Sequence, residues 1–190
     1  MIDDEEFIRG KVPMTKREIR ILTLAAAKLE NNSVVADIGA GTGSISIEAA
    51  RIANNGKIFA VERNPNAVEL IKRNVEKFSV NNVEIICAAA PDGLEDLPEL
   101  DAAIIGGSGG RLEKILDALK LKIGGRVVVN AITLQTAAAC VEYFRTHNWK
   151  YEACQVQITR LERVGNYDMS KALNPVWIIS AYREENFNVH

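Results

Sequence analysis

The chain has 190 residues, of which 47% are hydrophobic and 25% charged, and its formal net charge is −2. This composition is typical of an ordinary globular domain, so we expect residues 1–190 to form a single domain. A slightly negative net charge argues against a protein that binds nucleic acid through non-specific attraction to phosphates, so nucleic acid is an unlikely partner.

The sequence also argues against a membrane, secreted or metal-binding protein. It lacks an apolar run of the roughly 20 residues that a membrane-spanning helix needs, and its start, MIDDEEFIRGK, is acidic where a secretory signal is basic. We therefore expect a cytoplasmic protein without a membrane partner. Cys87, Cys140 and Cys154 show no CxxC spacing, so we expect three buried thiols and no metal site.

The first predicted helix lies within residues 15–30. Thr15 and Glu18 have the spacing of a capping box, in which two side chains close the first turn of a helix. Apolar residues then recur at helical spacing and predict one buried face. They are Ile19, Leu22, Ala26 and Leu29.

Strands and helices alternate along most of the chain. Asn64 and Pro65 have the pattern of a helix cap followed by proline in the first turn. The connections between the first five predicted strands are long enough for parallel pairing. These strands are 34–38, 57–61, 83–88, 102–106 and 123–132, and later helices are expected within 111–121 and 134–149.

The end of the chain breaks this alternation. Residues 151–164 and 175–183 both read as strands, and only the polar segment 165–174 separates them. That segment is too short for a crossover helix, so it is predicted to be a loop that joins an antiparallel hairpin.

The stretch VVADIGAGTGSISIEAARIA predicts a strand, a glycine loop and a helix between residues 34 and 53. Glycines at such a turn let the backbone approach a ligand closely. A dinucleotide loop prefers G-x-G-x-x-G, whereas Ser44 stands here in place of the third glycine. Asp37 before the loop would repel a pyrophosphate but attract an ammonium. Glu62, after the second strand, could accept ribose hydroxyls in either kind of site.

The pattern D-x-G-x-G-x-G, the acid after the second strand and the antiparallel last strand resemble the class I methyltransferases. The resemblance covers nearly the whole chain. It implies an α/β Rossmann-like fold with a seven-stranded, mostly parallel sheet, an antiparallel last strand and helices on both faces. It also implies S-adenosylmethionine as cofactor. A NAD-dependent enzyme and a non-catalytic sensor of S-adenosylmethionine are the alternatives.

The glycine-rich segment after the fourth predicted strand, residues 106–110, offers backbone N–H groups at a helix start. Many amino-methylating enzymes of nucleic acids carry (N/D)PP(Y/F) at this place. Such a segment suits a carboxylate-bearing or bulky planar substrate. Gly106, Gly107 and Ser108 are therefore the predicted substrate-binding residues, acting through their N–H groups.

This segment, taken with VPMTKREIR, CAAAPDGL and NPVWII, is similar to the decarboxylating precorrin methyltransferases of cobalamin biosynthesis. The resemblance implies methylation of cobalt-precorrin-6B or precorrin-6B at carbon-15, with loss of a ring acetate as carbon dioxide. The substrate would then be a tetrapyrrole and the assembly a homotetramer, which the terminal hairpin could help to form. An RNA (tRNA) methyltransferase of the same fold is the alternative.

Carried over residue by residue, the resemblance implies a set of cofactor contacts but no catalytic acid or base. Ala89 replaces the family's usual acid before Ala90, which favours backbone contacts there. Lys11, Lys16 and Arg17 are expected to add positive charge at the mouth of the site. The implied cofactor contacts are Thr15, Gly39, Ala40, Gly41, Thr42, Gly43, Glu62 and Ala90.

Overall fold

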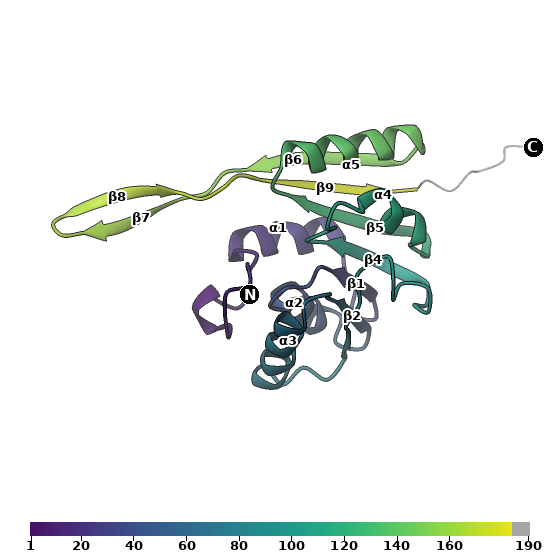
Figure 1. The fold of residues 1–190 in the computed structure, drawn as a ribbon, viewed down its shortest axis with the longest axis horizontal. Coiled ribbons are helices and arrows are strands. Elements are labelled where there is room, and N and C mark those ends of the chain that lie inside the picture. The colour runs from purple at the N-terminus through teal and green to yellow at the C-terminus, as the bar shows by residue number, and fades with distance from the viewer. Residues whose placement is uncertain (184–190) are drawn as a thin grey trace, which may run out of the picture.

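A computed structural model describes residues 1–183 of the chain (Figure 1). Its helices are η1 (Asp4–Glu6), α1 (Arg17–Ala27), α2 (Ser44–Ile52), α3 (Pro65–Lys77), α4 (Leu112–Ala118) and α5 (Leu134–Thr146). Its strands are β1 (Val34–Ile38), β2 (Lys57–Val61), β3 (Val83–Ile86), β4 (Leu100–Ile105), β5 (Leu121–Ala131), β6 (Lys150–Val156), β7 (Thr159–Val164), β8 (Tyr167–Ala172) and β9 (Val176–Tyr182).

The main sheet has seven strands in the order β3-β2-β1-β4-β5-β9-β6. The first five strands pair in parallel, and β9 runs antiparallel to both β5 and β6. The predicted sheet, mostly parallel with an antiparallel last strand, is therefore confirmed. Strand order reverses between β1 and β4, which is where parallel α/β sheets bind their ligands.

Helices cover both faces of the sheet, as predicted (Figure 1). Alternate residues of a strand point to opposite faces, so each central strand contacts helices on both sides. Val35 and Ile58 pack with residues of α1 and α2 on one face. Ile38 and Val61 pack with residues of α4 and α5 on the other face. Burial on both sides explains why these strands read as continuous apolar runs. Within residues 1–183, no helix is long and apolar enough to cross a membrane.

The helix starts test two capping predictions. Asn64 caps α3, since its side chain accepts a hydrogen bond from the Asn66 N–H, and Pro65 occupies the first turn. The capping box at Thr15 is wrong: α1 begins at Arg17, and Lys16 precedes it in an extended conformation without a side-chain cap. The physical reason is that the Glu18 carboxylate accepts two hydrogen bonds from Arg160 instead.

Two predictions of burial are also wrong. Leu22, assigned to the buried face of the first helix, is exposed. Only Cys140 is a buried thiol, whereas Cys87 and Cys154 are exposed and free. Cys154 lies on the edge strand β6 and Cys87 directly follows the opposite edge strand β3, where one side of the sheet has no neighbour.

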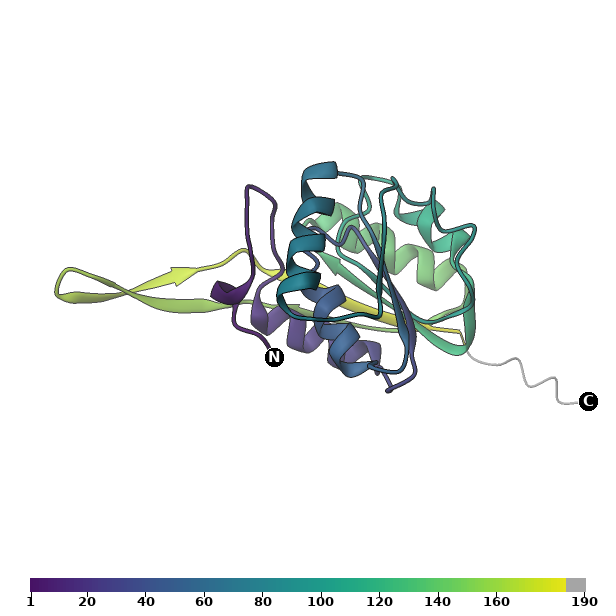
Figure 2. The same cartoon turned by 90° about the horizontal axis from the view of Figure 1, so that it is seen from below.

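The terminal hairpin is confirmed in its pairing but is longer than expected. β6 pairs with β9 from Lys150 opposite Tyr182 to Val156 opposite Val176. The predicted loop 165–174 is wrong, because Tyr167–Ala172 forms β8, which pairs with β7 in a separate two-stranded sheet. This arm (residues 159–172) projects away from the body in both views (Figures 1 and 2). Both faces of the arm are largely exposed, so no alternation of buried residues marked β8 as a strand.

Candidate active site

A cavity of about 480 Å³ lies at the carboxyl ends of the parallel strands. Its walls come from the segment before α1, the loops after β1, β2, β3, β4 and β5, and the base of the arm. Seven of the eight predicted cofactor residues line it: Thr15, Gly39, Ala40, Gly41, Thr42, Glu62 and Ala90. Gly43 is not among the lining residues and instead precedes α2 as its N-cap.

The loop after β1 is built on glycines that have little space around them. Gly39 has φ +72°, and a Cβ there would lie 2.7 Å from the backbone N and O of Gly107. Gly43 has φ +77°, and its Cβ would lie 3.0 Å from Ile71 of α3. A side chain at Gly39 would push the β1 and β4 loops apart, and one at Gly43 would push the start of α2 away from α3.

Glu62 joins the ends of β1 and β2. One carboxylate oxygen accepts the Gly41 N–H and the other accepts the Asn64 N–H, each at 2.9 Å. The residue is 9% exposed and lines the cavity. A carboxylate oxygen can accept more than one hydrogen bond, so Glu62 can hold this loop and still receive ligand hydroxyls.

Asp37 is a buried acid in the same wall, only 1% exposed. Burial raises its pKa to about 6, the nearby charge of Glu62 adds to this, and hydrogen bonds from Ser46 oppose it. The cavity wall therefore holds a carboxylate whose ionised form is poorly compensated by protein groups. A cationic ligand group placed beside it would supply the missing compensation.

Thr42 carries a buried hydroxyl in the cavity wall for which residues 1–183 provide no hydrogen-bond partner. The Thr42 carbonyl, by contrast, accepts a hydrogen bond from Asn74 at 3.0 Å. Buried polar groups are nearly always paired, so this hydroxyl marks a place where a bound molecule would complete the bonding.

The predicted role of Gly106 and Gly107 needs correction. Both residues line the cavity, but their N–H groups lie 2.9 and 3.4 Å from the Ile38 carbonyl and donate to it. The reason is that the β1–β4 pairing continues past the end of the strands. These two N–H groups are therefore not free to bind a substrate carboxylate, and of the predicted segment Ser108 alone stays a candidate.

Positive charge at the cavity comes partly from residues that sequence analysis missed. Lys16 lines the cavity as expected, whereas Lys11 and Arg17 do not. Arg63 and Arg111 line it instead. Arg63 is the second residue after β2, and Arg111 directly precedes α4 in the loop after β4. Both loops leave the carboxyl ends of parallel strands, and that position is the signal that could have identified them.

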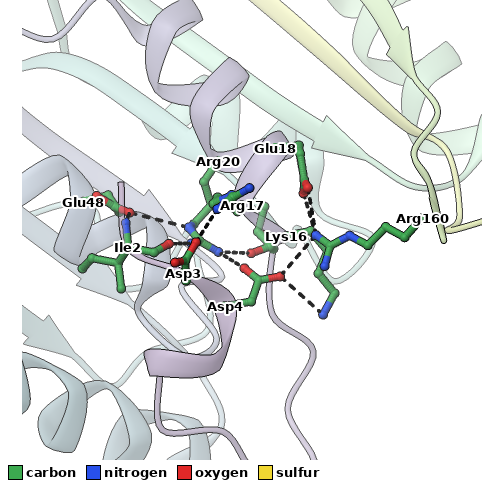
Figure 3. Close-up of polar contacts among 10 residues, drawn as sticks. Ile2, Asp3, Asp4, Lys16, Arg17, Glu18, Arg20, Glu48 and Arg160 are labelled. Atoms are coloured by element: carbon green, nitrogen blue, oxygen red, sulfur yellow. Dashed lines mark hydrogen bonds and ion pairs between the residues drawn. The ribbon is translucent and has the colours of Figure 1, made fainter. Parts of the chain in front are cut away.

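The segment that precedes α1 is fixed to the cavity by a buried arginine (Figure 3). Arg20 is 0% exposed and donates to the Asp4 carboxylate at 2.6 Å, the Ile2 carbonyl at 2.6 Å and the Thr15 carbonyl at 2.8 Å. Arg160, at the start of the arm, binds Glu18 and lies 3.8 Å from Asp4. The N-terminal segment, α1 and the arm are thus linked around one buried charge.

The remaining wall of the cavity was not predicted from the sequence. It is formed by the end of β5 and the base of the arm, and it is mostly apolar. The one sequence feature that could have indicated this wall is a polar residue, Asn130, at the end of the apolar run of β5. The wall residues are Asn130, Ile132, Ile158, Leu173, Asn174 and Val176.

The cavity residues fit S-adenosylmethionine better than a dinucleotide. Asp37 suits an ammonium and Glu62 suits hydroxyls, whereas both carboxylates would repel a pyrophosphate in a poorly solvated wall. Among residues 1–183, no group of three or more His, Cys, Asp and Glu side chains is arranged to hold a metal ion.

Comparison with known proteins finds relatives over nearly the whole chain. Residues 6–183 match the family model described as a precorrin methyltransferase domain. The chain is 44% identical over 183 residues to a probable cobalt-precorrin-6B C(15)-methyltransferase (decarboxylating) from Sulfolobus acidocaldarius, covering 94% of this chain and 95% of the relative.

Two solved structures share the fold over nearly the whole chain. One is a precorrin-6y C5,15-methyltransferase from Geobacter metallireducens, with a TM-score of 0.91, 44% identity and coverage of 96% and 97% of the two chains. The other is a precorrin 8W decarboxylase from Methanobacterium thermoautotrophicum, with a TM-score of 0.91, 34% identity and coverage of 96% and 100%.

The raised pKa of Asp37 predicts a distinct dependence of stability on pH. The folded state binds a proton more tightly than the unfolded chain, in which the pKa is near 3.8. This contribution therefore favours folding at low pH, and stability falls by about 3 kcal/mol as the pH rises from about 4 to above 6. Asp37→Asn should remove that fall, as measured by urea unfolding across this range. The exposed Asp92→Asn is the control, and an unchanged slope in Asp37→Asn would contradict the assignment.

Proposed function

The chain belongs to the precorrin methyltransferase family, and on this premise we propose that it methylates carbon-15 of a corrinoid precursor in cobalamin biosynthesis. The methyl donor is S-adenosylmethionine, the substrate is cobalt-precorrin-6B or precorrin-6B, and a ring acetate leaves as carbon dioxide. The observation that carries this proposal is one cavity lined both by the buried acids Asp37 and Glu62 and by a mostly apolar wall from the end of β5 and the base of the arm.

The polar wall is the proposed cofactor side. Asp37 would face the cofactor's ammonium, Glu62 its ribose hydroxyls, and the buried Thr42 hydroxyl one of its polar atoms. Ala40 and Ala90 would pack against its apolar parts, since both are small and buried in the cavity wall. The Thr15 segment closes this side because Arg20 holds its carbonyl in place.

The apolar wall and the cationic rim suit a planar macrocycle that carries acidic side chains. Ile132, Ile158 and Leu173 offer apolar surface for a ring face. Arg63 and Arg111 offer charges for its carboxylates. Ser108 stays a predicted substrate contact at the same end of the cavity.

In the proposed mechanism the protein acts by alignment and exclusion of water. S-adenosylmethionine, when bound, supplies an electrophilic methyl group. The two cavity walls hold the ring carbon in line with that group, which can provide much of the rate without a side-chain base. The conjugated ring supplies the electrons for attack, so the absence of a predicted catalytic acid or base is consistent with the chemistry.

The direct test is incubation of the purified chain with isotopically labelled S-adenosylmethionine and cobalt-precorrin-6B or precorrin-6B. We expect a product that has gained one methyl group and lost one carboxyl group by mass spectrometry. Label transferred to tRNA, with neither tetrapyrrole changed, would favour the RNA methyltransferase alternative. Binding of NAD in place of S-adenosylmethionine would contradict the cofactor assignment.

Glu62→Ala is expected to weaken S-adenosylmethionine binding by about 1 to 3 kcal/mol, the usual effect of losing a charged hydrogen bond. Loss of the acceptor for the Gly41 N–H would add to this effect by loosening the loop. Isothermal calorimetry with the cofactor alone measures it. Glu69→Ala on the exposed side of α3 is the matched control, and equal affinities for both variants would remove Glu62 from the cofactor site.

A homotetramer in the cytoplasm is the proposed state of the protein. The arm supports assembly, because Val164, Tyr167 and Met169 share one of its faces and are more than half exposed. The exposed, unpaired thiols of Cys87 and Cys154 are compatible with a reducing compartment.

Replacing Val164 and Met169 together by glutamate should reduce the assembly to smaller species, because charges would occupy the face that we expect to meet a neighbouring copy. Multi-angle light scattering gives the mass. Ser170→Glu adds charge to the opposite face of the arm and serves as the control. A wild-type chain that is monomeric at micromolar concentration would contradict the proposal.

A further inference from the structure

Ser46 connects α2 to a buried acid in the cavity wall. It lies in the first turn of α2 and is 0% exposed. Its hydroxyl donates a hydrogen bond to Oδ2 of the Asp37 carboxylate. Asp37 lines the cavity whereas Ser46 does not, so the serine holds the acid from behind the cavity wall.

The other surroundings of Asp37 do not favour its ionised form. Its neighbours in the sheet are Ala60 of β2 and Ile104 of β4, and both are apolar. Burial raises the Asp37 pKa and the nearby charge of Glu62 adds to this, whereas the hydrogen bonds from Ser46 lower the pKa. Ser46 is thus the residue that stabilises the carboxylate as an anion.

The contact with Ser46 leaves Asp37 able to accept further hydrogen bonds. An ionised carboxylate has roughly four acceptor sites, and Ser46 supplies two donors, its hydroxyl and its N–H. The torsion that turns an aspartate carboxylate is a soft one, so these donors decide the direction in which its oxygens point. The acceptor sites that stay open therefore have a fixed orientation in the cavity wall.

We propose that Ser46 is a positioning residue for S-adenosylmethionine, directing the Asp37 carboxylate toward the cofactor's ammonium. This inference rests on the proposed function and deepens its account of the cofactor side. In a buried wall an ionised carboxylate attracts an ammonium much more strongly than a neutral carboxyl group does. A hydroxyl stabilises the ionised form without adding a positive charge that would repel the ammonium, which a lysine or an arginine would do.

This role distinguishes two ligands that differ in one group. S-Adenosylhomocysteine carries the ammonium, whereas its deaminated analogue keeps the adenosine and the carboxylate but lacks the ammonium. A residue that acts through Asp37 should affect binding of the first ligand and not of the second. A residue that only stabilises the fold should affect both ligands equally.

Isothermal calorimetry with the full chain at about pH 8 compares the two ligands. Ser46→Ala should bind S-adenosylhomocysteine about tenfold more weakly, the lower end of the effect of losing a hydrogen bond to a charged group. Its affinity for the deaminated analogue should be unchanged, which also shows that the variant is folded. Ser46→Cys, nearly isosteric but a weaker donor, should show an intermediate loss. Equal losses for both ligands, or no loss, would overturn the inference.

The pH dependence of binding gives a second readout. In wild type, the affinity for S-adenosylhomocysteine should fall as the pH drops through about 6, because Asp37 then holds a proton that has to leave before the ammonium binds well. Without the hydroxyl the Asp37 pKa rises further, so in Ser46→Ala this fall should begin at a higher pH. Identical pH profiles for Ser46→Ala and wild type would contradict the proposal.

A double variant tests whether Ser46 acts through Asp37. Asp37→Asn should weaken binding of S-adenosylhomocysteine and abolish the fall in affinity near pH 6. Adding Ser46→Ala to Asp37→Asn should then cause no further loss, because the charge that the serine stabilises has been removed. A further loss of about tenfold in the double variant would show that Ser46 acts on another group.

Ser44 offers a matched control in the same turn of α2. It is 3% exposed, does not line the cavity and, within residues 1–183, forms no hydrogen bond with Asp37. Ser44→Ala should match wild type for both ligands. If wild type binds neither ligand, the proposed function fails. If wild type prefers S-adenosylhomocysteine over the deaminated analogue and Ser46→Ala keeps the whole preference, only the role of Ser46 fails.

Discussion

The approach of two backbones at Gly39 and Gly107 is the constraint on which the site depends. A single added carbon at Gly39 would lie 2.7 Å from the neighbouring loop, so the carboxyl ends of β1 and β4 meet only because glycine is present. The Ile38 carbonyl then receives the N–H groups of Gly106 and Gly107 and closes the gap between the strands. Gly39, Gly106 and Gly107 all line the cavity, so this contact fixes one part of its wall.

The side walls are prepared in different ways before a ligand arrives. On the cofactor side, Glu62 is already hydrogen-bonded to two backbone N–H groups, so its oxygens are fixed where a ligand would meet them. On the opposite side, Thr23 fixes Asn130 from within α1. In both places a polar group of the cavity wall is already held by protein, which lowers the reorganisation that binding requires.

The sequence predicted the parts of the fold that depend on local pattern. Apolar runs and the glycine loop identified the five parallel strands, and Asn64-Pro65 located the start of α3. The strand β8 escaped because its side chains are exposed on both faces, so pairing with β7 left no periodic trace in the sequence. The capping box failed because Glu18 pairs with Arg160, a partner 142 residues away.

The same distinction applies to the site. The loop after β1 and the acid after β2 could be identified because consecutive residues create them. The apolar wall could not be identified from the sequence. Its residues come from the end of β5 and from the two segments that join the arm to the sheet, and these are close only in the folded chain. For Gly106 and Gly107 the segment was correctly placed beside the cavity, but the sequence did not reveal that the Ile38 carbonyl takes their N–H groups.

The ion pairs around Arg20 and Arg160 also bear on the order in which the chain can become organised during synthesis. Asp4 is contacted by Arg20 from α1 and by Arg160 from the arm, so its environment is incomplete until the arm has been synthesised. The segment around Asp4 is made well before one of its partners, and it therefore reaches its final surroundings only after β7 has emerged from the ribosome.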